Sequence, residues 1–257
     1  MGSSIDDYAP PPRAALVTGG ARRIGAAICR RLAAEGFRVA VHYNRSRAEA
    51  EALAAEIGGV ALAADLAEEG QVAGLVGRAA AALGPLGVLV NNASTFERDR
   101  IDSMTRASWD HHLEPNLRAP AVLIQAFAAQ LPADRQGAVV NLLDQRVWNL
   151  TPDFLSYTVS KVGLWALTQT LALALAPRIR VNGIGPGPAV ANERQTAAHF
   201  AAQQAAMPLG RGTTPQEIAA ALSFILAMPA MTGQMLALDG GQHLCWAPPA
   251  RGIVPPE

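Results

Sequence analysis

Tyr157 and Lys161 stand four positions apart, so on a helix their side chains lie on the same face. A phenol titrates near pH ~10, and its use as an acid or base at neutral pH requires stabilising the phenolate by roughly 4 kcal/mol. A neighbouring ammonium provides that stabilisation. The pair predicts a tyrosine that transfers a proton, with the alternative that it is a chance pair on a helix.

A glycine-rich turn precedes a helical segment near the start of the chain, in the order Thr18-Gly19-Gly20-Ala21-Arg22-Arg23-Ile24-Gly25. Glycines at such a turn permit positive φ and close approach of a ligand, and the helix N-terminus offers N–H groups to a pyrophosphate. We expect a dinucleotide site here, with an ordinary βα turn as the alternative. Arg23 stands where a third glycine would let the ligand come closer.

The next apolar run ends in a second polar stretch, His42-Tyr43-Asn44-Arg45-Ser46. An NAD site carries a carboxylate about 20 residues past the glycines for the adenosine ribose, whereas a basic residue accommodates a 2′-phosphate. This stretch has no Asp or Glu, while Arg45 offers a bidentate donor and Ser46 a hydroxyl donor. It predicts NADP(H) rather than NAD as the cofactor.

Short runs rich in Val, Ile and Leu alternate with Ala-rich stretches at helical spacing, which predicts an α/β fold with a parallel sheet. The predicted strands are residues 14–17, 38–42, 60–63, 88–90, 138–142, 179–183 and 236–238. The predicted helices are residues 23–35, 48–57, 68–83, 106–131, 156–176 and 215–228. We expect one domain over residues 13–247, between a flexible segment at 1–12 and a Pro-rich tail at 248–257.

The composition excludes several classes of protein. The chain of 257 residues is 50% hydrophobic and 16% charged, so it is not intrinsically disordered. Its 21 basic and 21 acidic residues give a formal net charge of zero, which predicts no bulk attraction to nucleic acid or anionic membranes. The sequence contains no run of about 18 apolar residues, so it predicts no membrane-spanning helix.

The cysteines and the N-terminal residues bear on the compartment. Cys29 and Cys245 are far apart, which predicts neither a disulfide framework nor a metal-ligand cluster. Residues 1–13 have neither a basic start nor an apolar core, so we expect no secretory signal. A reducing cytoplasm is the expected compartment.

Ordered motifs over residues 13–242 resemble the short-chain dehydrogenase/reductase family. They are Thr18-Gly19 with Gly25, Asn91-Asn92-Ala93, Asn116-Leu117-Arg118-Ala119-Pro120, Tyr157-Thr158-Val159-Ser160-Lys161, and Asn182-Gly183-Ile184-Gly185-Pro186-Gly187. The resemblance implies a single-domain Rossmann fold, with a doubly wound seven-stranded parallel sheet flanked by helices. It also implies nicotinamide hydride transfer and a homotetramer, consistent with helical segments that are apolar on more than one side.

The resemblance assigns the site residues. The implied cofactor-binding residues are Gly19, Arg22, Arg23, Ile24, Tyr43, Asn44, Arg45, Ser46, Asp65, Leu66, Asn92, Ala93, Ser94, Lys161, Pro186 and Gly187. Asp65 is expected near the adenine, and Pro186 with Gly187 beside the nicotinamide. The implied catalytic residues are Asn116, Asp144, Tyr157 and Lys161, and Asn116 is expected to hold a water in a proton relay to Lys161.

Two departures from the family pattern resemble its pteridine reductase branch: Arg23 replaces the third glycine, and Asp144 the usual catalytic serine. The branch implies a substrate site of Arg23, Ser94, Phe96, Asp144 and Tyr157. An ionised aspartate accepts hydrogen bonds and repels a developing alkoxide, but it can hold a heterocycle N–H or a water that protonates a ring nitrogen. The alternatives are that Phe96 is a core or lid residue, Arg23 serves only the pyrophosphate, and Asp144 caps a loop.

The predicted function is reduction of a dihydropterin or similar conjugated heterocycle by NADPH. The alternatives are a carbonyl reductase for 3-oxoacyl, ketone or aldehyde substrates, and a non-catalytic NADP-sensing protein. Pro188-Ala189 departs from the branch, which usually has a hydroxyl-bearing residue there. Residues 191–210 are expected to form a substrate lid, and His111 and His112 to be solvated or packed rather than catalytic.

Overall fold

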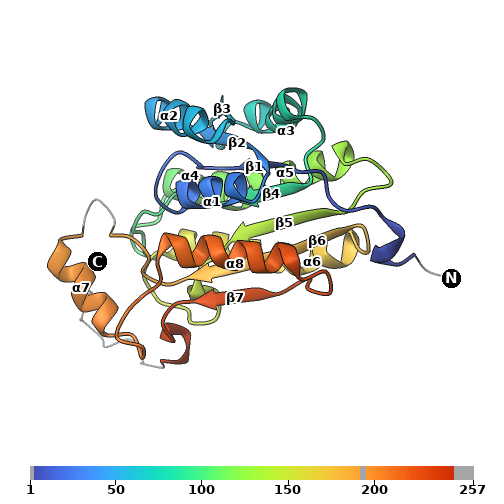
Figure 1. Cartoon of the computed structure of the whole chain (residues 1–257). Coiled ribbons are helices and arrows are strands. Elements are labelled where there is room, and N and C mark those ends of the chain that lie inside the picture. The colour runs from blue at the N-terminus through green and yellow to red at the C-terminus, as the bar shows by residue number, and fades with distance from the viewer. Residues whose placement is uncertain (1–2, 192–194, 246–257) are drawn as a thin grey trace.

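Seven parallel strands form one sheet with the order β3-β2-β1-β4-β5-β6-β7 (Figure 1). The computed structural model describes residues 3–191 and 195–245. The strands are β1 (Ala14–Val17), β2 (Arg38–Tyr43), β3 (Val60–Ala63), β4 (Val88–Asn91), β5 (Gly137–Leu142), β6 (Ile179–Pro186) and β7 (Met235–Leu238). The predicted doubly wound Rossmann fold is confirmed. The predicted tail at 248–257 and residues 192–194 of the predicted lid lie outside the described residues.

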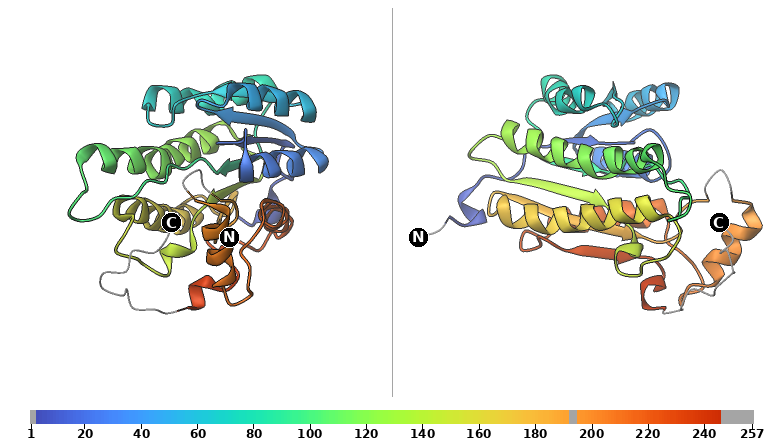
Figure 2. Two further views of the ribbon diagram at one scale, coloured as in Figure 1. Left: turned by 90° about the vertical axis from the view of Figure 1, so that its left-hand side faces the viewer. Right: turned by 180° about the vertical axis from the view of Figure 1, so that it is seen from behind.

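Helices cover both faces of the sheet, so the central strands β1, β4 and β5 are buried along their whole length and are mostly apolar. The α-helices are α1 (Arg23–Ala34), α2 (Arg47–Ile57), α3 (Glu69–Leu83), α4 (Arg106–Leu113), α5 (Ala119–Gln130), α6 (Leu155–Ala174), α7 (Ala197–Ala205) and α8 (Pro215–Ala227). Short 3-10 turns are η1 (Ile5–Asp7), η3 (Gln145–Val147) and η4 (Gln242–Leu244). The two views of Figure 2 show α5 and α6 on the face opposite α1 and α8.

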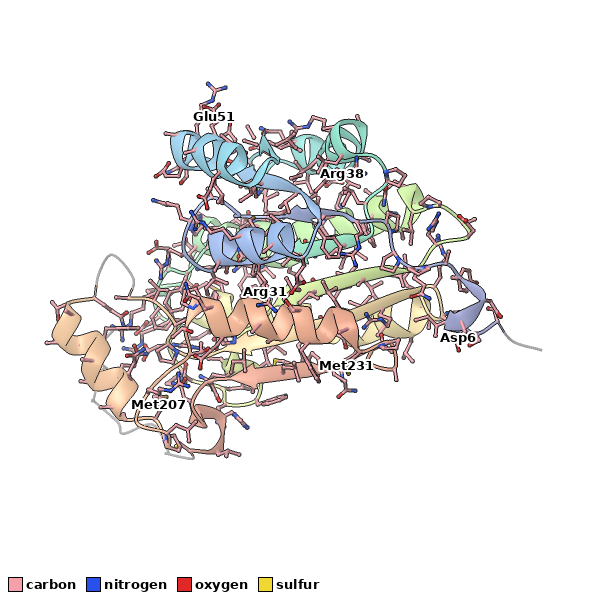
Figure 3. The ribbon with its side chains drawn as sticks, viewed as in Figure 1. Asp6, Arg31, Arg38, Glu51, Met207 and Met231 are labelled. Atoms are coloured by element: carbon pink, nitrogen blue, oxygen red, sulfur yellow. The ribbon has the colours of Figure 1, made fainter. Side chains whose placement is uncertain are left out.

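Each face of the sheet has its own hydrophobic core. Ile28 of α1, Leu53 of α2 and Leu222 of α8 belong to one core cluster, and Leu75 of α3 and Phe127 of α5 to the other. Polar contacts also join neighbouring helices: the Arg31 side chain of α1 donates from Nε to Ser223 Oγ of α8 at 2.9 Å, between the two helices in Figure 3. Helices therefore hold the strands from both faces of the sheet, and this packing fixes the positions of the C-terminal ends of the strands.

The predicted helix over residues 106–131 is interrupted. A π-helical turn, η2 (Glu114–Arg118), separates α4 from α5, and the Ala119 amide donates to the carbonyl of Glu114 across it. Pro115 and Pro120 have no amide proton, so regular α-helical hydrogen bonding cannot run through this stretch. The turn holds Asn116 fully buried. Such turns are frequent at functional sites.

The N-terminal segment lies near the N-terminal ends of the strands, next to the residues that precede β5. The Ala9 amide donates to the carbonyl of Asp134 at 2.8 Å, and the Gln136 amide donates to the carbonyl of Ala9 at 2.9 Å. The Gln136 side chain donates to the carbonyls of Ile5 and Tyr8. Within the described residues, no helix combines the length and apolarity that a membrane crossing requires.

Candidate active site

A cleft of about 840 Å³ follows the C-terminal ends of the strands. Turns after β1, β2, β4, β5 and β6 form its walls, and α7 contributes from beyond the end of the sheet (Figure 1). The sequence-predicted residues that line it are Gly19, Arg22, Arg23, Ile24, Tyr43, Asn44, Arg45, Ser46, Asn92, Ala93, Ser94, Phe96, Asp144, Tyr157, Lys161, Pro186 and Gly187. Asp65, Leu66 and Asn116 are not among the lining residues.

The glycine-rich turn after β1 is closely packed. Gly19 has φ +59°, and a Cβ on it would lie 3.0 Å from Ala93 Cα. A Cβ on Gly25 would lie 2.1 Å from the Gly19 carbonyl oxygen. The Asn92 side chain donates to the carbonyls of Thr18 and Gly19 at 2.8 and 3.0 Å. These glycines therefore bring the loops after β1 and β4 together at the floor of the cleft.

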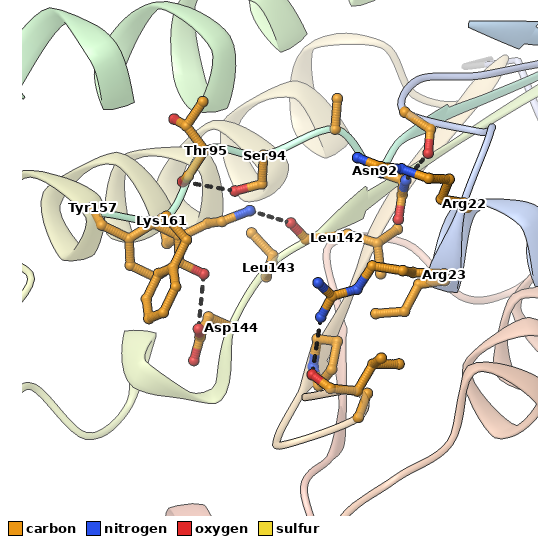
Figure 4. A pocket seen from close by; sticks show the side chains of 18 of the residues that line it. Arg22, Arg23, Asn92, Ser94, Thr95, Leu142, Leu143, Asp144, Tyr157 and Lys161 are labelled. Carbon is orange, nitrogen blue, oxygen red and sulfur yellow. Dashed lines mark hydrogen bonds between the residues drawn. The ribbon is translucent and has the colours of Figure 1, made fainter. Parts of the chain in front are cut away.

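Arg23 has a backbone conformation that favours glycine. Its φ is +53°, in the left-handed region that disfavours residues with a Cβ. Its guanidinium is exposed to the cleft, where Nη2 donates to the carbonyl of Val190 at 2.9 Å (Figure 4). Arg23 thus links the N-terminus of α1 to the segment that follows β6.

The buried side chain of His42 holds the glycine-rich turn after β1. Its side chain is 2% exposed, and Nδ1 accepts a hydrogen bond from the Gly19 amide at 3.0 Å. Because Nδ1 is an acceptor, Nε2 carries the proton and donates to the carbonyl of Ala64 at 3.0 Å. Burial lowers the pKa of His42 to about 4, against the opposing effect of the Ala64 hydrogen bond. His42, near the C-terminal end of β2, thus shapes the turn after β1, a role that we did not predict.

Donor groups dominate this end of the cleft. Arg22, Arg23 and Arg45 are exposed lining residues, and Ser46 adds a hydroxyl. Carboxylates among the described lining residues come from Glu97 and Asp144, after β4 and β5. Three guanidiniums, a hydroxyl and a helix N-terminus suit a dinucleotide that carries an additional phosphate.

The predicted catalytic side chains meet at the other end. The Tyr157 hydroxyl donates to Asp144 Oδ2 at 2.8 Å (Figure 4). Lys161 Nζ donates to the carbonyl of Leu142 at 2.8 Å and lies 5.7 Å from the centroid of the Tyr157 ring. Burial lowers the pKa of Lys161 to about 8, partly offset by the charge of Asp144. A buried ammonium beside a phenol favours the phenolate.

Asp144 also holds its own loop. Oδ1 accepts a hydrogen bond from the Arg146 amide at 2.8 Å and caps the turn η3, while Oδ2 faces Tyr157. The Asp144 carboxylate therefore does both things: it caps the loop, as one alternative predicted, and it contacts the phenol of Tyr157. One oxygen fixes the side chain, and the other accepts from the phenol that we predicted to transfer a proton.

Asn116 lies behind the cleft and supports the loop after β4. Its Oδ1 accepts from the Thr95 amide at 2.9 Å, and its Nδ2 donates to the Thr95 carbonyl at 3.0 Å and to Ser160 Oγ at 3.1 Å. These contacts connect η2 to α6 and to the segment that carries Phe96.

An aromatic cluster completes the end of the cleft that we predicted to bind the substrate. The ring of Phe96 stacks on Phe154 with centroids 4.5 Å apart and meets Tyr157 edge-on at 4.7 Å. The guanidinium carbon of Arg146 lies 4.8 Å from the Phe154 centroid and 5.6 Å from that of Phe96. Phe154 has φ +59° and is the N-cap of α6. We did not predict Arg146 or Phe154, because η3 and the left-handed N-cap that place them leave no local sequence motif.

Several further lining residues were not predicted individually as site residues. They are Thr95, Glu97, His111, Leu143, Gln145, Gln195, Phe200, Gln203 and Gln242. Gln195, Phe200 and Gln203 belong to the segment predicted as a lid, and these residue types do not indicate which class of ligand the lid would contact. No group of three or more His, Cys, Asp or Glu side chains suited to a metal ion occurs in the described part of the chain.

Comparison with known proteins agrees with this geometry. A family model described as enoyl-(acyl carrier protein) reductase matches residues 19–243. The chain belongs to the short-chain dehydrogenase/reductase family. The family predicted from the sequence motifs is thereby confirmed.

Relatives in this family carry different substrate names. The 3-oxoacyl-acyl-carrier-protein reductase FabG of Staphylococcus aureus is 32% identical over 242 residues, which cover 90% of this chain and 98% of the relative. The probable galactose dehydrogenase GalD of Rhizobium meliloti is 34% identical, with coverage of 89% and 94%. The family is therefore shared by proteins of several named activities.

Among solved structures, the chain is similar to FolM alternative dihydrofolate reductase 1 of Brucella suis in complex with NADP. The identity is 48% and the TM-score 0.89, over 93% of this chain and 98% of the other. A blue fluorescent protein from a metagenomic library, in complex with NADPH, is 34% identical with a TM-score of 0.82, over 90% and 98% of the two chains. Both structures contain NADP or NADPH, a nicotinamide dinucleotide with a 2′-phosphate.

Proposed function

We propose that this short-chain reductase uses NADPH to reduce a dihydropterin or a similar conjugated heterocycle. The hydrogen bond from the Tyr157 hydroxyl to Asp144 Oδ2 carries the proposal, because it places a carboxylate where the family has a serine hydroxyl. A carboxylate there disfavours a developing alkoxide and suits a substrate with N–H donors. The similarity to the FolM dihydrofolate reductases, at 48% and 49% identity, supports the same substrate class.

The chain binds NADPH along the whole cleft. Arg22, Arg23 and the N-terminus of α1 hold the pyrophosphate, and Arg45 with Ser46 holds the 2′-phosphate. Lys161 holds the nicotinamide ribose, while Pro186 and Gly187 border the nicotinamide. The bound cofactor supplies the hydride. Asp65 and Leu66 lie outside the cleft lining, and their predicted part in cofactor binding stays a prediction.

Tyr157 gives up the proton that balances hydride addition to a C=N carbon. Its O–H bond breaks as the ring nitrogen of the substrate is protonated, and the ammonium of Lys161 stabilises the phenolate that remains. Asp144 accepts an N–H from the substrate or holds the water through which the proton passes. Asn116 is the proposed water holder behind Lys161, from its position beside Ser160.

The substrate ring lies between Phe96 and the nicotinamide. Phe96 provides a flat apolar face, Ser94 a hydroxyl, and Arg23 a cation beside the ring. Pro188 and Ala189 line the cleft without a hydroxyl, so the ring is recognised mainly by Asp144, Tyr157 and Ser94.

A carbonyl reductase is the second candidate, because relatives at 32% identity over 90% of the chain are named 3-oxoacyl reductases. An assay of NADPH consumption separates the candidates by comparing dihydrobiopterin and dihydromonapterin with 3-oxoacyl esters and simple aldehydes. We expect the dihydropterins to be reduced with the higher kcat/KM. Faster turnover of the esters or aldehydes would refute the pterin assignment and leave the reductase assignment in place.

The proposal extends to a homotetramer in the cytoplasm. Val159, Val162 and Leu173 lie on the outer side of α6 and are 41%, 36% and 83% exposed in one chain. A helix that is apolar on both sides is typical of a subunit interface. We base the proposal of a cytoplasmic compartment on the sequence, which has two widely separated cysteines and no disulfide-rich pattern.

A further inference from the structure

A buried polar cluster lies behind the substrate end of the cleft. Its members are His112 and Ser156, both 0% exposed, and Asp99, which is 3% exposed. The Ser156 amide donates to Asp99 Oδ1 at 3.1 Å, and the Ser156 hydroxyl donates to Asp99 Oδ2. The cluster joins the loop after β4 to the first turn of α6.

The hydrogen bonds of His112 define one arrangement of protons. Nε2 lies 2.9 Å from the Glu97 amide nitrogen and can only accept from it. Nδ1 therefore carries the ring proton, which faces Ser156 Oγ at 2.7 Å and the Ser108 carbonyl at 3.0 Å. The Ser156 proton goes to Asp99, the charged acceptor. A directional chain runs from Glu97 through His112 and Ser156 to Asp99.

This chain of hydrogen bonds is not a nucleophilic triad. Ser156 Oγ is fully buried and directs its proton to the carboxylate rather than to the imidazole. Activation of a serine nucleophile requires a histidine that accepts the hydroxyl proton and a path to the substrate. The cluster therefore has a positional role.

The cluster and Asn116 fix the loop on both sides of Phe96. Asn116 accepts from the Thr95 amide at 2.9 Å, and His112 accepts from the Glu97 amide at 2.9 Å. Tyr157 directly follows Ser156, which Asp99 holds. The edge-on contact between Phe96 and Tyr157, at 4.7 Å, joins the two segments that the cluster connects.

We propose that His112 is a positioning residue that, with Ser156 and Asp99, sets Phe96 against Tyr157 and thereby sets the orientation of a flat substrate. The proposal rests on the proposed function in one respect, that Phe96 forms the substrate face. Its structural part, anchoring of the Glu97 amide by neutral His112, is independent of the substrate.

Protonation of His112 breaks the anchor. An Nε2–H would face the Glu97 N–H, so two donors would oppose each other. Burial lowers the pKa of His112, with His111 acting in the same direction and Asp99 and Glu97 in the opposite one. The Tyr157 ring also faces His112, with ring centroids 6.0 Å apart. The anchor is therefore intact at neutral pH and is lost in acid.

Two substitutions of similar size test the anchor. His112→Gln places an amide oxygen near the position of Nε2 and can still accept from Glu97, whereas His112→Asn reaches only the position of Nδ1. Amide hydrogen exchange of a peptide covering residues 94–99, measured without substrate, reads the anchor directly. We expect about tenfold faster exchange in His112→Asn than in His112→Gln, the effect of one lost hydrogen bond.

The kinetic test uses the same pair of variants. With dihydrobiopterin as the probe, we expect KM to rise about tenfold in His112→Asn, with kcat and the Kd for NADPH near wild type, and to be largely restored in His112→Gln. The KM effect should vanish in a Phe96→Ala background, because the two residues act through one contact. Should His112→Asn fail to fold, His112→Leu, which also has no acceptor at the position of Nε2, takes its place in both measurements.

The outcomes separate this inference from the proposed function. Equal exchange rates in the Asn and Gln variants, or an Asn effect that persists in the Phe96→Ala background, would overturn the role of His112. Failure of the wild type to reduce dihydrobiopterin, with the exchange difference intact, would instead refute the proposed substrate and retain the anchor.

Discussion

Two residues of the site occupy backbone conformations that their side chains disfavour. Arg23 and Phe154 are the described non-glycine residues with positive φ, at +53° and +59°. Both begin a helix of the site, α1 and α6, and both line or support the cleft. Such strain costs about 1–3 kcal/mol per residue and persists where the surrounding structure enforces it. At these positions the chain gives up stability for the placement of a guanidinium and an aromatic ring.

Arg23→Gly should separate stability from cofactor binding. Glycine adopts positive φ without strain, so we expect an unfolding free energy about 1 kcal/mol above that of the wild type. The Kd for NADPH should rise, because a phosphate donor and the contact with Val190 are lost. Denaturant unfolding and fluorescence titration measure the two effects. Arg22→Gly is the control, because Arg22 has φ −139° and no strain to relieve. Equal stability changes in the two variants would contradict the argument.

Lys161 should impose an upper pH limit on turnover. Burial lowers its pKa to about 8, so the ammonium loses its proton above that pH and no longer stabilises the phenolate of Tyr157. We expect kcat/KM to be constant below about pH 8 and to fall above it. A pH profile at saturating NADPH tests this. Tyr157→Phe is the control, with turnover nearly abolished at every pH and cofactor binding retained. A profile that stays level to pH ~10 would contradict the role of the ammonium.

At the scale of elements, the strands, the glycine-rich turn after β1 and the order of motifs could be predicted, but the irregular turns η2 and η3 could not. Strands such as β1 and β4 are buried on both faces, so their apolar runs stand out in the sequence. The π-turn η2 was missed because a helical period continues through it, although Pro115 interrupts the hydrogen bonds. The tautomer and contacts of His42 depend on packing between β2, the turn after β1 and β3, which no local pattern encodes.

The turn after β1 should make the fold sensitive to acid through His42. The pKa of His42 is about 4 in the folded chain and about 6.5 when unfolded, so between these values only the unfolded chain is protonated. The unfolding free energy should therefore decrease as pH falls from 6.5 to 4, by about 3 kcal/mol from this group. Urea unfolding at several pH values measures the slope.

His42→Asn is the matched control for this slope. The Asn oxygen lies near the position of Nδ1 and can still accept from the Gly19 amide, but it does not titrate. We expect a lower stability at pH 7 and a shallower decline toward pH 4 than in the wild type. Parallel curves for the two proteins would mean that other groups cause the acid sensitivity.

At the scale of the whole molecule, a chain of zero formal net charge concentrates its unmatched positive charge at one end of the cleft. Arg22, Arg23 and Arg45 line the end after β1 and β2, where no described lining residue is a carboxylate. At the end after β4 and β5, the carboxylates of Glu97 and Asp144 are matched by the cationic side chains of Arg146 and Lys161. The field of the cleft therefore attracts an anion to the first end and orients a ligand that carries its phosphates there.

Leu173→Glu should dissociate the proposed tetramer. Leu173 is 83% exposed in one chain and lies on the outer side of α6 together with Val159 and Val162. A carboxylate there would have to be buried without a partner if the α6 faces of two subunits meet, which costs several kcal/mol. We expect a smaller assembly by light scattering, with the far-ultraviolet circular dichroism of the wild type. Leu209→Glu is the control, since Leu209 is 73% exposed but lies in the segment after α7. An unchanged mass for Leu173→Glu, or an equal loss of mass in both variants, would show that α6 is not the interface.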